Sequence, residues 1–215
     1  MVCTLSGISP RVGFERNHDP MFGDKYSKLL HLAMFSKALA TPQPDWAKST
    51  VQTGFCFYDG NQDMGKMSED LQKFLDTGEP PIVFTLGSAA VMDARDFYEQ
   101  SIAAAKMLNR RAVMLYGIFN EPPKGLDNDR VGFDYAPYGQ LFPRAAGVVH
   151  QGGVGTTSQV LRAGVPMLRN ALFARSARQC FALPKIRRGG NYQPGRLSSR
   201  KCGAEIGKII VEFKL

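Results

Sequence analysis

His150-Gln-Gly-Gly-Val-Gly-Thr-Thr157 is the stretch of this chain that decides the fold. It follows the apolar run Ala146–His150, which is predicted to be a buried strand, and it leads into Thr156–Ala163, a predicted helix that Gly164 stops. Glycines let the backbone approach a ligand closely, and a helix start presents free N–H groups and the positive end of the dipole. The stretch therefore favours a strand–loop–helix unit that holds an anion, with a diphosphate as the preferred ligand. The glycines alone leave open a purely structural tight turn.

The same alternation of apolar runs and helical patterns extends from Pro80 to Leu168. The further predicted strands and helices are Ile82–Leu86, Asp93–Asn109, Ala112–Tyr116, Val131–Tyr135, Pro137–Arg144 and Val165–Leu168. This alternation predicts an α/β fold, a Rossmann-like parallel sheet with helices on both faces. Its ligand crevice should lie at the carboxyl ends of the strands. Ser88, Ala136 and His150 fall at or near those ends.

Residues 1–79 mix Pro, Gly and charged residues with short apolar pieces, and they are predicted to form irregular connecting structure. A helix is predicted there around Asp24–Phe35. No apolar run reaches the ~18 residues of a membrane span, and the first residues lack the apolar stretch of a signal peptide. We therefore expect a globular cytoplasmic protein without a membrane span. Its four cysteines (Cys3, Cys56, Cys180 and Cys202) have no C-x-x-C spacing, so neither a metal site nor a disulfide framework is predicted.

The positive charge is concentrated at the end of the chain. Residues 169–215 contain 11 Lys or Arg and 2 Asp or Glu, a net charge of +9. Residues 1–168 contain 16 and 17, a net charge of −1, which brings the whole chain to +8. A basic tail could bind nucleic-acid phosphates. That is the weakest hypothesis, and we expect no nucleic-acid partner, because the tail has another explanation given below.

Two longer strings carry a family resemblance. Both PPIVFTLGS (Pro80–Ser88) and FDYAPYGQLFPRAAGVVHQGGVGTTSQVLRAGVPML (Phe133–Leu168) closely resemble the C-terminal donor domain of those GT-B glycosyltransferases that modify macrolides, sterols and similar lipophilic acceptors. PQPDW (Pro42–Trp46) and TGFCFYDG (Thr53–Gly60) resemble the segment that joins the two domains of that family. The resemblance implies the C-terminal half of a GT-B fold: a connector and acceptor-domain remnant at 1–79, a donor-binding domain at 80–168 and an off-pattern tail at 169–215.

The resemblance also implies a function and a site. It implies transfer of a sugar from a nucleoside diphosphate to the hydroxyl of a lipophilic acceptor, with inversion at the anomeric carbon. The expected nucleotide is UDP, and the reaction would need neither a cofactor nor a metal. His150 would support a phosphate oxygen, and the backbone near Ala136 would read the base. The residues implied to contact the diphosphate are Ser88, Gly152, Gly153, Gly155, Thr156 and Thr157.

The general base of this family, usually a histidine held by an aspartate, lies in an N-terminal acceptor domain that has no counterpart in this chain. We therefore assign no catalytic residue, and neither His18 nor His31 is expected to act as one. Without a base, roughly 10²- to 10⁴-fold in rate would be lost. The alternative function is thus a nucleotide-binding remnant that cannot transfer sugar unless another chain supplies the acceptor domain.

The tail also departs from the family after Leu168, where an Asp-Gln pair that binds the sugar should follow. Arg175–Phe181 (RSARQCF) lacks that pair, but nucleotides that encode it can read Asp-Gln-Pro-Asp-Asn-Ala when shifted by one base. Our hypothesis is a frameshift near Leu168, which would explain the basic tail without nucleic acid. The coding DNA tests this hypothesis: if no one-base shift restores the sequence Asp-Gln-Pro-Asp-Asn-Ala, the hypothesis is wrong.

Overall fold

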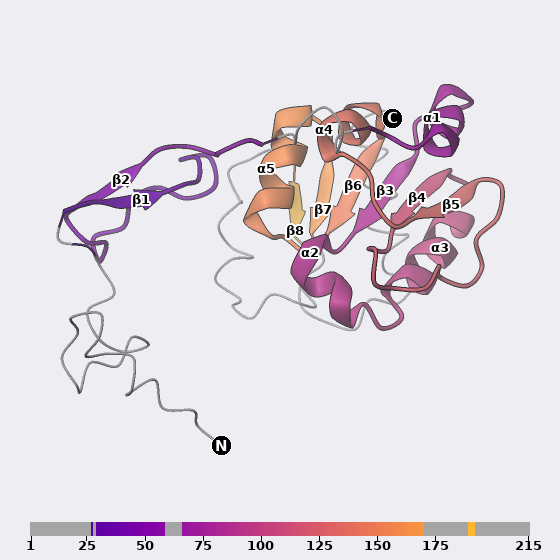
Figure 1. Ribbon diagram of the computed structural model, residues 1–215, viewed down its shortest axis with the longest axis horizontal. Coiled ribbons are helices and arrows are strands. Elements are labelled where there is room, and N and C mark those ends of the chain that lie inside the picture. The colour runs from indigo at the N-terminus through magenta and orange to yellow at the C-terminus, as the bar shows by residue number, and fades with distance from the viewer. Residues whose placement is uncertain (1–26, 28, 59–65, 170–188, 192–215) are drawn as a thin grey trace, which may run out of the picture.

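The main body of the protein is one parallel sheet (Figure 1). The computed structural model describes residues 27, 29–58, 66–169 and 189–191. The strands run side by side in the order β5-β4-β3-β6-β7-β8, and every neighbouring pair is parallel. Their bounds are β3 (Ile82–Thr85), β4 (Ala112–Leu115), β5 (Arg130–Phe133), β6 (Gly147–His150), β7 (Met167–Arg169) and β8 (Gly189–Asn191). The predicted α/β fold with a Rossmann-like parallel sheet is confirmed.

The strand order creates a switch point between β3 and β6. From β3 the chain adds β4 and β5 on one side, and it then returns to place β6 on the other side of β3, followed by β7. Thr85 and His150, the last residues of β3 and β6, are register partners. In open parallel sheets of this kind, the crevice outside the strand ends at such a point is the expected ligand site.

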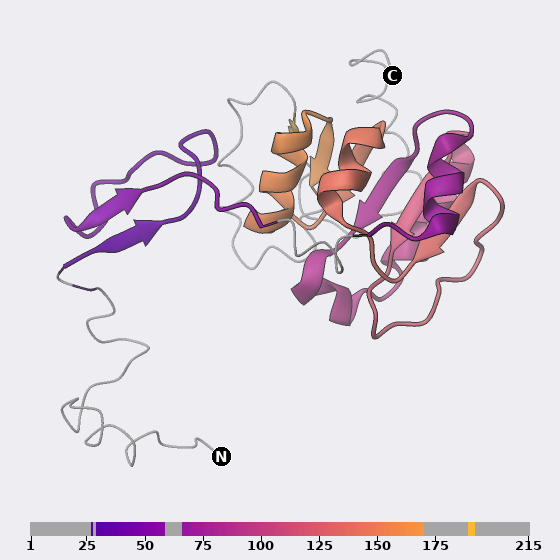
Figure 2. The ribbon, with the colours of Figure 1, turned by 45° about the horizontal axis from the view of Figure 1, so that its top comes forward.

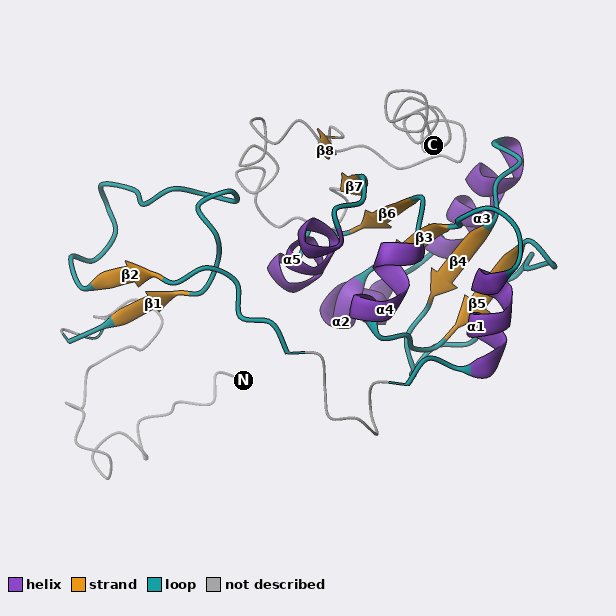
Figure 3. Ribbon diagram, turned by 90° about the horizontal axis from the view of Figure 1, so that it is seen from above, coloured by secondary structure: helices purple, strands orange, loops and turns teal. Residues whose placement is uncertain are grey.

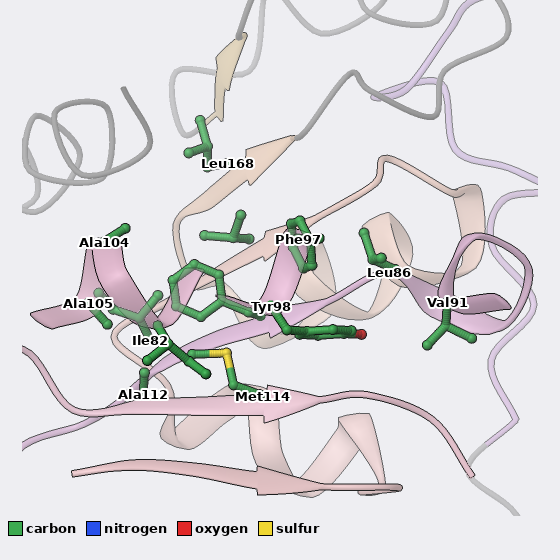
Figure 4. Close-up of a cluster of buried hydrophobic side chains, with 13 residues drawn as sticks. Ile82, Leu86, Val91, Phe97, Tyr98, Ala104, Ala105, Ala112, Met114 and Leu168 are labelled. Atoms are coloured by element: carbon green, nitrogen blue, oxygen red, sulfur yellow. The ribbon is translucent and has the colours of Figure 1, made fainter. Parts of the chain in front are cut away.

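Helices cover both faces of the sheet (Figure 3). α3 (Phe97–Met107) packs on one face, where its Phe97 and Tyr98 join Ile82 and Met114 in a buried cluster (Figure 4). The opposite face is covered by α1 (Glu69–Asp76), α4 (Tyr138–Leu141), η4 (Phe142–Arg144) and α5 (Val154–Ala163). Because both faces are covered, the central strands are continuous apolar runs, and all four residues of β3 and of β4 are buried.

The helix predicted at Asp93–Asn109 begins later than predicted. Two short helices, α2 (Gly87–Ala90) and η3 (Val91–Asp93), follow β3, and α3 starts only at Phe97. Arg95 stands between them with a φ of 50°, a backbone conformation that no α-helix accommodates. Asp93, the first residue of the predicted helix, therefore lies in η3, where it pairs with Arg95 at 3.1 Å. None of the described helices is long and apolar enough to cross a membrane.

The α1 helix packs on the sheet although it precedes Pro80. Ser68 caps its start by accepting the N–H of Leu71 at 3.3 Å, and Leu71 and Leu75 are buried against the sheet. At its other end, the Arg111 side chain donates to the carbonyls of Phe74 and Glu79 and lies over the Phe74 ring. We propose on these contacts that the folded donor-domain unit begins near Ser68 rather than at residue 80.

Two short strands lie apart from the main sheet (Figure 2). β1 (His31–Ala33) and β2 (Thr50–Gln52) pair in parallel. The prediction of a helix around Asp24–Phe35 is therefore wrong over its described part, because residues 31–33 are extended and hydrogen-bond to β2. Leu32 and Val51 are about half exposed on this pair. Of the tail, Arg169 ends β7 and Gly189–Asn191 forms β8; the other residues of 169–215 lie outside the described ranges.

Candidate functional site

A cavity of about 880 Å³ opens at the carboxyl ends of the strands. Its wall is formed by the connections that follow β3, β4 and β5, by residues along α5 from Gly155 to Ala163, and by Tyr58. Arg162 contributes a cation and Asp134 a carboxylate to the lining. The apolar and aromatic lining residues include Tyr58, Val91, Met92, Leu115, Ile118, Phe119, Tyr135 and Tyr138. The cavity therefore lies where the strand order puts the ligand crevice.

The sequence-predicted site residues divide into two groups. Ser88, Ala136, Gly155 and Thr156 line the cavity, although they come from three different connections. His150, Gly152, Gly153 and Thr157 are not among its lining residues and lie behind that wall, with His150 and Thr157 almost fully buried. The structure thus brings the first four residues together around one space.

The glycine loop turns tightly between β6 and α5. Gly152 has a φ of +91°, which an L side chain rarely adopts, and its N–H donates to His150 Nδ1 at 3.1 Å. Gly153 is the N-cap of α5, and Gly155 stands in the first turn with open space where a side chain would be. The first N–H groups of a helix have no intrahelical acceptor. Their partial positive charge therefore lies at the cavity wall formed by Gly155 and Thr156.

His150 is held inside the protein through both ring nitrogens. Nδ1 accepts the Gly152 N–H, and Nε2 lies 3.5 Å from Met167 Sδ. Burial, together with the charge of Arg169, lowers the pKa of His150 to about 3. The ring is therefore neutral near pH 7 and braces the loop from behind. A direct contact with a phosphate oxygen stays a prediction.

Replacing the titrating ring is expected to flatten the acid side of the stability profile. The folded-state pKa of His150 lies below its unfolded value of about 6.5, so the unfolded chain binds the extra proton. The contribution of the neutral ring is complete above pH ~6.5 and is lost as the pH falls from there toward 3, at about 1.4 kcal/mol per pH unit at most. His150→Asn keeps an acceptor for the Gly152 N–H but does not titrate. Urea unfolding at pH 7, 5.5 and 4 should show a steeper loss for wild type, and parallel losses would contradict this assignment.

Gln151 and Gln159 also belong to the site, although the sequence did not predict them. Gln151 Nε2 lies only 2.3 Å from where a Cβ on Gly87 would stand, so this side chain bridges the β3–α2 turn and the glycine loop. Gln159 lines the cavity one helical turn after Gly155. Among the described residues, the Oε1 atoms of both are buried without a hydrogen-bond partner. The i, i+4 spacing from Gly155 is the signal that could have identified Gln159.

Comparison with solved structures gives the class of protein first. The chain superposes on the glycosyltransferase of kitacinnamycin with a TM-score of 0.65 at 17% identity, covering 83% of this chain and 45% of that one. It superposes on CalG4, the calicheamicin glycosyltransferase, with a TM-score of 0.61 at 15% identity, covering 84% and 43%. At such identities the likeness concerns the fold alone. The fold is that of the GT-B glycosyltransferases.

Comparison of sequences narrows the class. The chain is 38% identical to O-mycaminosyltylonolide 6-deoxyallosyltransferase of Streptomyces fradiae over 145 residues, 67% of this chain and 33% of that protein. It is 32% identical to a sterol 3-beta-glucosyltransferase of Arabidopsis thaliana over 146 residues, 65% of this chain and 22% of that one. No family model matches. The chain is a relative of macrolide and sterol glycosyltransferases, as its motifs indicated, and it spans a third or less of these two relatives.

Proposed function

We propose that this chain binds a nucleoside-diphosphate sugar in the cavity beside β3 and β6, with UDP as the expected nucleotide. One observation carries the proposal: Gly155 and Thr156, at the start of α5, line a cavity whose wall also includes the β3–α2 and β5–α4 connections. A helix start favours an anion through its free N–H groups and dipole. Ser88 and Thr156 line the same cavity, and their hydroxyls would add polar contacts to a diphosphate.

The β5–α4 connection suits the base and the ribose. The backbone at Ala136 offers N–H and C=O groups, and Tyr135, 57% exposed beside it, offers a ring face for stacking. Gln159 supports the same assignment, since a sugar hydroxyl would give its buried Oε1 atom the donor that it lacks among the described residues. Because these contacts do not select one base, the titration with UDP, dTDP and GDP described below identifies the preferred nucleotide.

The reaction that this site supports is inverting sugar transfer to a lipophilic acceptor hydroxyl. The nucleoside diphosphate leaves as an anion, so N–H groups fixed at the start of α5 would stabilise the charge that grows in the transition state. We propose the cytoplasm as its location and no nucleic-acid partner.

A second candidate function is nucleotide binding without transfer. Among the described residues that line the cavity, Asp134 is the one carboxylate and no histidine is present. Because His150 is buried with both nitrogens engaged, it is not available as a base for the acceptor. Calorimetry combined with a transfer assay separates the two functions: binding without turnover favours the second, unless an added acceptor domain restores transfer.

Gly155→Asp is expected to weaken UDP binding by about tenfold while leaving the fold intact. The new carboxylate would enter open space at the cavity wall and repel the diphosphate. It would also suit the helix dipole, so the melting temperature should not fall. Gly155→Ser is the neutral control. Calorimetric titration with UDP, dTDP and GDP measures the effect. Equal affinities of the Asp and Ser variants, or no nucleotide binding by wild type, would refute the proposed site.

A further inference from the structure

Tyr138 stands where three parts of the site meet. It begins α4 directly after the Ala136–Pro137 connection, and its ring stacks on Phe142 with centroids 4.4 Å apart. Its hydroxyl lies 3.0 Å from Thr85 Oγ1, at the end of β3. The Thr156 side chain also interacts with this hydroxyl, an interaction that opposes the raised pKa of the phenol. One phenol group therefore links the base-side connection, the end of β3 and the start of α5.

The two threonines connect this phenol to the loops of the proposed diphosphate site. Thr85 Oγ1 accepts the N–H of Gly87 at 3.3 Å, at the turn that carries Ser88. Thr156 Oγ1 lies 3.2 Å from where a Cβ on Gly87 would stand, so the start of α5 and the turn after β3 are in close contact. A change in the position of either threonine would therefore alter the distance between the two loops.

We propose that Tyr138 is a positioning residue for the diphosphate, whose hydroxyl fixes the β3–α2 turn relative to the start of α5 by holding Thr85 and Thr156. The inference rests on the proposed function and deepens it, because it names a residue that acts through others. A phenol can donate one hydrogen bond and accept another, so it can serve both threonines at once. Burial raises the pKa of Tyr138, which keeps that proton in place.

The test is Tyr138→Phe, which removes the hydroxyl and keeps the ring that stacks on Phe142. The dissociation constant for UDP should rise about three- to tenfold, the effect of losing one or two hydrogen bonds. The dissociation constant for uridine, followed by NMR titration, should stay unchanged because uridine has no phosphate to position. The matched control is Tyr98→Phe: the Tyr98 hydroxyl is buried and donates to the Leu115 carbonyl rather than to either threonine. Its UDP affinity should equal that of wild type.

A second variant keeps the test decisive if Tyr138→Phe does not fold. Thr85→Val removes the partner hydroxyl at nearly constant volume and should give the same loss for UDP with none for uridine. In the double variant the two losses should not add, since both remove one linkage. UDP affinity within twofold of wild type in these variants, or an equal loss for uridine, would overturn the inference. Failure of wild type to bind UDP would instead refute the proposed function.

Discussion

Gly87→Ala is expected to weaken UDP binding by about tenfold to hundredfold and to lower the unfolding free energy by ~1–2 kcal/mol. Gly87 has a φ of +66°, so an alanine there is strained by its backbone alone. The added methyl would also lie 2.3 Å from Gln151 Nε2 and 3.2 Å from Thr156 Oγ1. Because the Gln151 amide is the end of a flexible side chain, it would be displaced first. The β3–α2 turn and the glycine loop would then separate.

Gly164→Ala separates the strain from the clash. Gly164 ends α5 with a φ of +71°, close to that of Gly87, and nothing lies within 4 Å of the position that its Cβ would occupy. It should lose similar stability in urea unfolding and keep the UDP affinity of wild type. If both variants bind UDP equally, contact between the two loops is not needed for the site.

Phe84→Ala is expected to cost ~3–5 kcal/mol of unfolding free energy, the largest stability effect that we predict. Phe84 is fully buried in β3, the strand between β4 and β6, and it packs in the cluster that α3 covers. Since a domain is stable by only ~5–15 kcal/mol, this loss would remove a large share of the stability of the domain.

The control for this prediction is Phe119→Ala. Phe119 is 77% exposed, so the same chemical change should alter the unfolding free energy by no more than ~0.5 kcal/mol. Urea titrations followed by circular dichroism measure both values at equal pH and salt. Similar small losses for the two variants would mean that the β3 face is not the core that holds this domain together.

The sheet could be predicted from sequence because its central strands are buried on both faces. Ile82–Thr85 and Ala112–Leu115 are apolar runs bounded by turn residues, and both were predicted to within one residue. The α1 helix was missed because its apolar residues are few and stand among exposed charges such as Glu69 and Lys73. Its stability comes from tertiary packing of Leu71 and Leu75, which local pattern does not reveal.

The site was predictable in its loops but not in its cross-contacts. The glycine spacing located Gly155 and Thr156 at a helix start, as found, because that signal is local. The roles proposed for Gln151 and Tyr138 depend on neighbours far away in the chain, namely Gly87 and Thr85. Such contacts follow from strand order rather than from spacing. The roles of the eight predicted site residues remain predictions.

The adjacency of β3 and β6 would couple nucleotide binding to the rate at which this protein is degraded. Thr85 and His150 are neighbours in the sheet, although the chain between them forms β4 and β5 before it returns to β6. A nucleotide bound in the cavity, which Thr85 at the end of β3 and Thr156 at the start of α5 both line, would therefore stabilise the folded sheet by about 2.7 kcal/mol at a hundred times its dissociation constant. Because proteases cleave the unfolded chain, the half-life of this protein would then rise and fall with the concentration of nucleotide sugar.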